Sequence, residues 1–132
     1  MSLLTGGLHH LSIRTTDMSR AKRFYTETLG FPQVLETDGA ILLNARGTLF
    51  GLLGPAQETS PKDRFDPFRV GLDHIALAVD NAESLHGLKQ QLDAAGVRNN
   101  GVEDDTLTGA RYIAFYDPDG IAWELYAMPA SS

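Results

Sequence analysis

The stretch VGLDHIALAVDN, residues 70–81, decides the fold that we predict for this chain. Apolar residues alternate at Ile75, Leu77 and Val79, which is the period of a β-strand with one buried face. The opposite face carries His74 and two alanines. Because small side chains beside an imidazole leave room for a ligand, this strand is the first candidate for a binding site.

The stretch LHHLSIRTTD, residues 8–17, is a second copy of this pattern, and it aligns His10 with His74, 64 residues further along. An amphipathic helical pattern follows each copy, at residues 18–29 and 82–95, and each pattern ends at a glycine. An internal repeat of this kind indicates two copies of one supersecondary unit.

Apolar periodicity and turn residues together predict the remaining elements. Strands are expected at residues 8–16, 31–37, 39–44, 48–53, 72–79, 97–104, 110–116 and 121–127. Three prolines between residues 55 and 69 predict a linker or a loop over the site. We therefore predict an α+β fold with two βαβββ modules in a single domain over residues 1–132, the modules at 8–54 and 70–128 and the linker at 55–69.

Composition narrows the class of protein. A chain of 132 residues that are 42% hydrophobic is large enough to bury a core. Eleven basic against seventeen acidic residues give a net charge of −6, which argues against nucleic acid or an anionic membrane as a partner. The sequence has no cysteine, no recognisable signal peptide and no apolar run long enough for a bilayer, so we expect a cytoplasmic protein.

The last predicted strand, IAWELYA at residues 121–127, holds a second chemical signal. Trp123 marks its packed face, so Glu124 lies on the other face, where a sheet carboxylate is costly unless a cation or hydrogen bonds compensate it. If the two modules pair their first and last strands, His10, His74 and Glu124 converge. Two imidazoles with one carboxylate are a ligand set for a divalent transition metal.

Four motifs, in order along nearly the whole chain, resemble the vicinal oxygen chelate superfamily. They are a histidine and an aspartate seven residues apart at 10–17, FYTETLGF at 24–31, DHIALAVD at 73–80 and DPDGIAWEL at 117–125. This superfamily includes glyoxalase I, extradiol dioxygenases, fosfomycin- and bleomycin-resistance proteins and methylmalonyl-CoA epimerase. The resemblance implies a cupped, eight-stranded mixed sheet around a metal, frequently in a homodimer whose chains share each cup.

The resemblance also implies His10, His74 and Glu124 as the ligands of a divalent ion, with Fe²⁺, Mn²⁺, Zn²⁺ and Ni²⁺ as candidates. Many members add a fourth ligand at the position of Gly51, so this chain is expected to have three. The missing fourth ligand argues against an activity like that of glyoxalase I or the epimerase. The remaining ligand set, two histidines and one carboxylate, is the pattern of extradiol dioxygenases and fosfomycin transferases. These relatives commonly keep a tyrosine where this chain has Ala114.

Strand parity predicts the residues that would surround a substrate. They are Ser12, Arg14, Ile41, Leu43, Leu49, Gly51 and Leu53. Such a largely apolar floor suits a small, flat or aliphatic molecule with vicinal oxygens. We expect Arg14 to hold an anionic group, although a surface ion pair is an equal alternative for it.

The leading hypothesis is a small metal-dependent enzyme of the dioxygenase or glyoxalase type. Its candidate catalytic residues are Glu124, Tyr112 and Tyr116, where either tyrosine or water would transfer a proton. The alternative to a functional role is a structural one: His10 would be a half-buried histidine bonded to the backbone, and the tyrosines would be ordinary aromatic residues of the sheet. The competing class is a binding protein that sequesters a planar drug or metabolite, but bleomycin-resistance binders lack the metal ligands, so the three ligands favour an enzyme.

Overall fold

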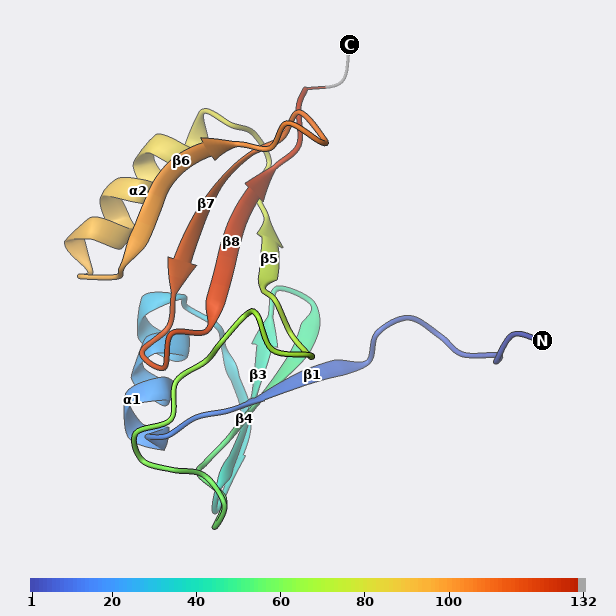
Figure 1. The fold of residues 1–132 in the computed structure, drawn as a ribbon, viewed down its shortest axis with the longest axis vertical. Coiled ribbons are helices and arrows are strands. Elements are labelled where there is room, and N and C mark those ends of the chain that lie inside the picture. Colours follow the sequence, from blue (N-terminus) through green and yellow to red (C-terminus); the bar gives the residue numbers. More distant parts are fainter. Residues whose placement is uncertain (131–132) are drawn as a thin grey trace. The chain divides into compact units, whose positions relative to one another are not determined.

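A computed structural model describes residues 1–130, and the chain divides into two compact units, Met1–Asp63 and the part that follows from Arg64. The boundary lies inside the segment predicted as a linker, residues 55–69. Each unit contains one helical region and four strands in βαβββ order, which confirms the predicted fold class (Figure 1). The eight strands form two four-stranded mixed sheets. A single domain with modules at 8–54 and 70–128 stays a prediction.

The first unit has a sheet of strand order β1-β4-β3-β2. Its elements are β1 (His10–Arg14), α1 (Met18–Arg23), η1 (Phe24–Thr28), β2 (Gln33–Thr37), β3 (Ala40–Ala45) and β4 (Thr48–Leu53). The first and last strands, β1 and β4, are parallel, and the other pairs are antiparallel. The helical region α1 and η1 returns the chain so that these two strands run in the same direction.

The predicted helix at residues 18–29 changes type halfway. Asp17 caps α1, because its side chain accepts a hydrogen bond from Arg20 N at 3.1 Å. From Phe24 the turn widens to a π-helix, in which Leu29 N donates to Phe24 O. The wider turn buries two consecutive aromatic side chains, Phe24 and Tyr25.

The second unit repeats the plan with the order β5-β8-β7-β6. Its elements are β5 (Ile75–Ala78), α2 (Ser84–Ala94), β6 (Asn99–Asp104), β7 (Arg111–Tyr116) and β8 (Ala122–Ala127). Strand β5 is parallel to β8, and α2 packs against β6 and β7 (Figure 1). Strand β5 is shorter than the predicted 72–79, so His74 lies just before the strand.

One face of each sheet is buried. In the first unit the core includes Ile13, Tyr25, Phe31, Ile41, Leu43, Phe50 and Leu52. In the second it includes Leu85, Leu92, Ile113, Phe115 and Trp123. Those that lie on strands alternate along them, and the others come from the helical regions and the segment before β2, so the opposite face of each sheet is available for polar residues. Among residues 1–130, no helix combines the length and apolar character needed to cross a membrane.

Candidate functional site

The second unit brings together two of the three predicted metal ligands. Glu124 of β8 lies opposite Ala76 of β5, and His74 immediately precedes β5. The distance from His74 Nε2 to Glu124 Oε1 is 3.4 Å. On the other side of the ring, His74 Nδ1 lies 2.7 Å from Asp73 Oδ1. The imidazole is therefore held between two carboxylates.

Glu124 is the more enclosed member of this pair. Its side chain is 17% exposed, against 40% for His74. Burial raises the pKa of Glu124, and the neighbouring His74 opposes that rise. Three further carboxylates add to it, namely Asp105, Asp73 and Glu103. A positive charge at this point would offset the cost of keeping Glu124 ionised there.

The donor chemistry of the pair fits a divalent metal ion. An ionised Asp73 can only accept a hydrogen bond, so His74 Nδ1 carries a proton and a neutral ring turns its Nε2 lone pair toward Glu124. Two acceptor atoms 3.4 Å apart need a proton or a cation between them. Nitrogen and oxygen ligands that each lie about 2.0–2.2 Å from one tetrahedral ion are about 3.3–3.6 Å from each other. The observed separation matches that range.

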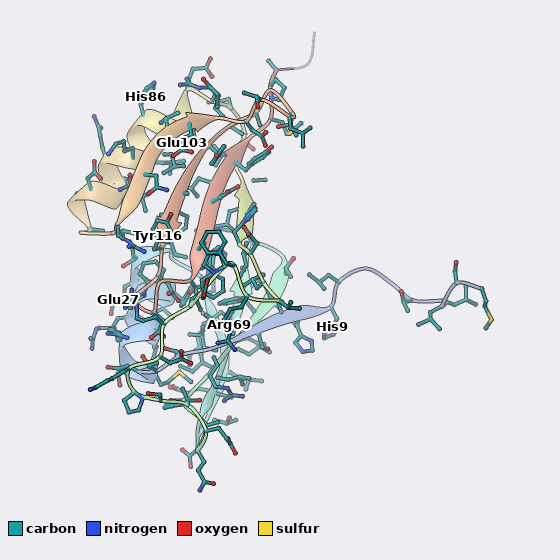
Figure 2. All side chains as sticks on the ribbon, viewed as in Figure 1. His9, Glu27, Arg69, His86, Glu103 and Tyr116 are labelled. Atoms are coloured by element: carbon teal, nitrogen blue, oxygen red, sulfur yellow. The ribbon has the colours of Figure 1, made fainter. Side chains whose placement is uncertain are left out.

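His10, the third predicted ligand, belongs to the first unit and begins β1. His10 Nδ1 lies 2.9 Å from Nδ1 of His9. Both residues are exposed, and Figure 2 labels His9. Within either unit, the described residues bring no three His, Cys, Asp or Glu side chains together as an ion-binding group. The structure thus assembles a pair of candidate ligands, and the addition of His10 to that pair stays a prediction.

The first unit gathers most of the predicted substrate-binding residues on one face of its sheet. The parallel register of β1 and β4 places His10 opposite Leu49, Ser12 opposite Gly51 and Arg14 opposite Leu53. Arg14 Nη1 donates to the carbonyl of Gly54 at 2.7 Å, which anchors the guanidinium at the end of the strand. The role of these residues in binding a substrate stays a prediction.

The prediction for Ile41 and Leu43 is wrong in one respect, because both side chains lie on the core face. Ile41 is 2% exposed and Leu43 is 0% exposed. The residue opposite Gly51 is Leu42. Alternation showed that Ile41 and Leu43 share a face but could not decide which face, since the tight turn between β3 and β4 sets the register. Leu42 therefore takes their place on the face of the first sheet that carries Gly51.

Ser12 fills the space that a side chain at Gly51 would need. A Cβ added to Gly51 would lie 2.5 Å from Ser12 Oγ and 3.3 Å from Ser12 Cβ. Both distances are shorter than an ordinary packing contact. In the second unit the corresponding opposite pair is Ala76 and Glu124. The small residue on β5 leaves room for the longer one on β8.

Tyr112 of β7, a predicted proton-transfer residue, shares the sheet face of Glu124. The register sets Ala114 opposite Glu124, and Tyr112 lies two residues before Ala114 on the same face. Tyr112 OH donates to Glu103 Oε2 at 3.0 Å. This hydrogen bond, with burial and the charge of Glu103, raises the pKa of Tyr112 to about 12. Tyr112 therefore keeps its proton and is better suited to donate a hydrogen bond than to act as a base.

Tyr116, the second predicted proton-transfer residue, lies at the end of β7 (Figure 2). Its hydroxyl accepts a hydrogen bond from Asn100 Nδ2 at 2.9 Å. The Arg98 guanidinium carbon lies 4.1 Å from the centre of its ring. These contacts fix the ring by a cation–π interaction and a hydrogen bond. His86, by contrast, lies on the outer side of α2, as expected for a solvated helix residue (Figure 2).

Sequence reasoning missed a polar network around Tyr126. Tyr126 OH lies 2.7 Å from Asp105 Oδ2 and 2.6 Å from Thr108 Oγ1. Its ring stacks with that of Tyr112 at a centroid separation of 5.9 Å. Tyr126 lies two residues after Glu124 on β8, so strand alternation puts both on one face, and this is the sequence signal that could have pointed to the network. Asp105 and Thr108 lie in the turn between β6 and β7, where no periodic pattern reports on side-chain direction.

Comparison with known proteins identifies the family. A family model described as the Glyoxalase/Bleomycin resistance protein/Dioxygenase superfamily matches residues 7–125. The chain is 31% identical to the uncharacterized protein YwkD of Bacillus subtilis strain 168, over 94% of this chain and 98% of that protein. It is 30% identical to the uncharacterized protein YaeR of Escherichia coli K12, over 90% and 94% of the two chains.

Solved structures agree with the family match. The crystal structure of SMU.1112c superposes with a TM-score of 0.78 and 27% identity, over 92% of this chain and 98% of that one. The match therefore spans both βαβββ units rather than one of them. This chain belongs to the glyoxalase, bleomycin-resistance protein and dioxygenase superfamily.

Proposed function

We propose that this chain is a small metal-dependent enzyme of the glyoxalase or dioxygenase type. In this proposal His10, His74 and Glu124 hold a divalent ion, and the substrate is a small, largely apolar molecule with vicinal oxygens. The observation that carries the proposal is the 3.4 Å separation of His74 Nε2 and Glu124 Oε1, with the far side of the ring already bonded to Asp73. Ligand histidines characteristically have their second nitrogen bonded in this way.

The ion would supply Lewis-acid chemistry toward two adjacent substrate oxygens, and Fe²⁺, Mn²⁺, Zn²⁺ and Ni²⁺ all suit this donor set. Glu124 contributes a carboxylate in a partly enclosed place, where its charge is only weakly screened by water. Tyr112 lies on the same face, and because its hydroxyl proton is donated to Glu103, its oxygen is left to accept a hydrogen bond from a substrate group. Proton transfer would fall to Tyr112, Tyr116 or water.

The first unit would contribute the substrate floor. Ser12, Leu49, Gly51 and Leu53 share the face of His10, and Leu42 joins them across from Gly51. This surface is mostly apolar, which suits an aliphatic or aromatic body on the substrate. Arg14, anchored through one nitrogen on the carbonyl of Gly54, has further N–H groups for an anionic substituent.

A second candidate function is a binding protein that sequesters a planar drug or metabolite without turnover. The stacked rings of Tyr112 and Tyr126 favour it, because aromatic faces bind flat molecules. Both hydroxyls are tied to carboxylates, Tyr112 to Glu103 and Tyr126 to Asp105, so the rings have fixed orientations. Tight binding of an aromatic compound by metal-free protein would support this function over the enzyme.

The decisive experiment is elemental analysis of protein purified without added metal, on wild type and on two variants. Glu124→Gln is expected to lose the ion while the fold is retained by circular dichroism. Glu103→Gln, which removes a carboxylate from the same sheet face, is the matched control and is expected to keep it. Retention of the metal by Glu124→Gln would reject the ligand assignment.

Titration with two probe substrates then separates the enzyme types. Iron in the protein with oxygen uptake on addition of a catechol would support the dioxygenase type. Nickel or zinc with turnover of the hemithioacetal of glutathione would support the glyoxalase type. We also propose a homodimer, because relatives commonly complete their sites from two chains, and a cytoplasmic location; light scattering would test the first and cell fractionation the second.

A further inference from the structure

The two predicted ligand histidines share a detail that their family role does not require. In each, the ring nitrogen Nδ1 contacts the residue immediately before it in the sequence. His74 Nδ1 lies 2.7 Å from Asp73 Oδ1, and His10 Nδ1 lies 2.9 Å from His9 Nδ1. The internal repeat aligns His9 with Asp73, so both units use the same position to hold the ring. In both, the nitrogen left for an ion is Nε2.

The chemistry of the two preceding residues is different. Asp73 Oδ1 lies 2.7 Å from His74 Nδ1, whereas Glu124 Oε1 lies 3.4 Å from Nε2, so the closer carboxylate favours the tautomer with the hydrogen on Nδ1 and the lone pair on Nε2. His9 offers an imidazole, which donates in one tautomer and accepts in the other. When His9 donates, the neutral ring of His10 accepts at Nδ1, carries its hydrogen on Nε2 and has no lone pair there for an ion.

We propose that Asp73 and His9 are positioning residues that set the tautomers of the two ligand histidines unequally. Asp73 favours the tautomer of His74 that is ready to coordinate. His9 lets the ring of His10 exchange between a ready and an unready tautomer. The ligand histidine of the second unit therefore has its coordinating tautomer before an ion binds. The ligand histidine of the first unit takes that tautomer fully only when an ion binds. The consequence for metal affinity rests on the function proposed above, whereas the tautomers are properties of the metal-free chain.

Long-range proton–nitrogen NMR of the metal-free full chain tests the tautomers directly, at a pH where histidine rings are neutral. Wild-type His74 is expected in the Nδ1–H form, and Asp73→Ala is expected to move it to the Nε2–H form. Asp73→Asn keeps an acceptor oxygen, so it is expected to restore the wild-type tautomer without the charge. An unchanged tautomer in Asp73→Ala would overturn the inference.

The reciprocal exchange tests the first unit. Wild-type His10 is expected to show averaged signals from both tautomers, and His9→Asp is expected to fix it in the Nδ1–H form that His74 has. Both preceding residues are exposed, and the Asp73 side chain is 75% exposed, so neither substitution disturbs the core. A single fixed tautomer of His10 in wild type would contradict the proposed inequality.

Calorimetric titration with Zn²⁺ alone tests the consequence. Asp73→Ala is expected to weaken Zn²⁺ binding by about 10- to 100-fold, which is typical when the partner of a ligand histidine is removed. Asp73→Asn is expected to lose less, and Glu103→Gln nothing. Wild type that binds no Zn²⁺ would reject the proposed function and leave the tautomer result as the test of this inference. Unchanged affinity in Asp73→Ala would overturn the positioning role itself.

Discussion

The two units place different side chains at the same pair of opposite strand positions. In the first unit Ser12 lies opposite Gly51, and in the second Ala76 lies opposite Glu124. A side chain on Gly51 would collide with Ser12, whereas Ala76 has no γ atom to obstruct Glu124. The comparison shows that the side chain on the first strand limits the space for the side chain opposite it on the last strand.

The difference extends over the whole exposed face of each sheet. Leu53 of the first unit and Tyr126 of the second hold corresponding positions, since they lie opposite Ala40 and Tyr112 in their own sheets. Apart from His10, Ser12 and Arg14, the first face is largely apolar, and the other carries hydroxyls bonded to carboxylates. The two units therefore share a strand order while the side chains on their exposed faces differ in character.

The largest effect is expected from placing a side chain at Gly51. Gly51→Ala is expected to destabilise the chain by about 1–2 kcal/mol, because overpacking costs about 1–3 kcal/mol and exceeds the gain from removing a flexible glycine. In a Ser12→Ala background the first unit resembles the second, and the same substitution is expected to be neutral or stabilising. Urea unfolding of the four proteins in this cycle measures the coupling. Additive effects would show that Ser12 is not the obstruction.

Helix capping is a feature that the two units share. Asp17 accepts a hydrogen bond from Arg20 N at 3.1 Å before α1, and Asn81, which the repeat aligns with Asp17, accepts one from Ser84 N at 3.0 Å before α2. Asp17→Ala and Asn81→Ala are each expected to lower the unfolding free energy by about 1 kcal/mol. Glu83→Ala is expected to lower it by much less, because Glu83 makes no side-chain cap bond within residues 1–130. A loss in Glu83→Ala equal to that in the two cap variants, measured by the same unfolding assay, would contradict this assignment.

Sequence periodicity predicted the fold because each strand has one buried face. Trp123 and its alternating neighbours identified the face of Glu124 without reference to any partner strand. Register was beyond this reasoning, as Ile41 and Leu43 show. The turn from β3 to β4 pairs Ala45 with Thr48, whereas the longer turn from β7 to β8 pairs Tyr116 with Ala122. A repeat offset therefore cannot be carried across turns of different length.

The candidate site was predictable in part for the same reason. Glu124 lies on β8 and His74 immediately before β5, where alternation still indicates direction, and the structure brings them to 3.4 Å. Asp73 lies two residues before β5, and its contact with Nδ1 of the His74 ring is revealed only by coordinates. Asp105 and Thr108 lie in a turn, so their contacts with Tyr126 depend on local turn geometry.

A third prediction sharpens the argument about Gly51 by using a glycine with free space around it. Gly87 lies within α2, and a Cβ added there would meet nothing within 4 Å. Gly87→Ala is expected to stabilise the chain by about 0.4–1 kcal/mol, because alanine has less freedom in the unfolded chain and favours the helix. The midpoint of urea unfolding measures it. Destabilisation at Gly87 would mean that crowding is not what separates the two glycines.

The smallest effect at neutral pH is expected from the acidic face of the second unit. Glu103 raises the pKa of Tyr112 from an ordinary value near 10 to about 12. The folded state therefore favours the protonated tyrosine. The contribution of this preference to the free energy of unfolding is complete below about pH 10 and is lost as the pH rises through about 12. Glu103→Gln removes the charge but keeps an oxygen that accepts from the neutral hydroxyl, so it is expected to lower the pKa of Tyr112 toward 10 and, because that hydrogen bond remains, to leave the stability at pH 7 nearly unchanged.

Absorbance of tyrosinate as a function of pH measures this shift, and Tyr112→Phe identifies which part of the curve belongs to Tyr112. Asp104→Asn is the matched control, because Asp104 is a neighbouring carboxylate that pairs with Arg111 rather than with Tyr112. A Glu103→Gln curve that superposes on the wild type would show that the hydrogen bond does not hold the proton. Tyr112 would then be available as a base, and the division between an apolar first unit and a proton-retaining second unit would no longer hold.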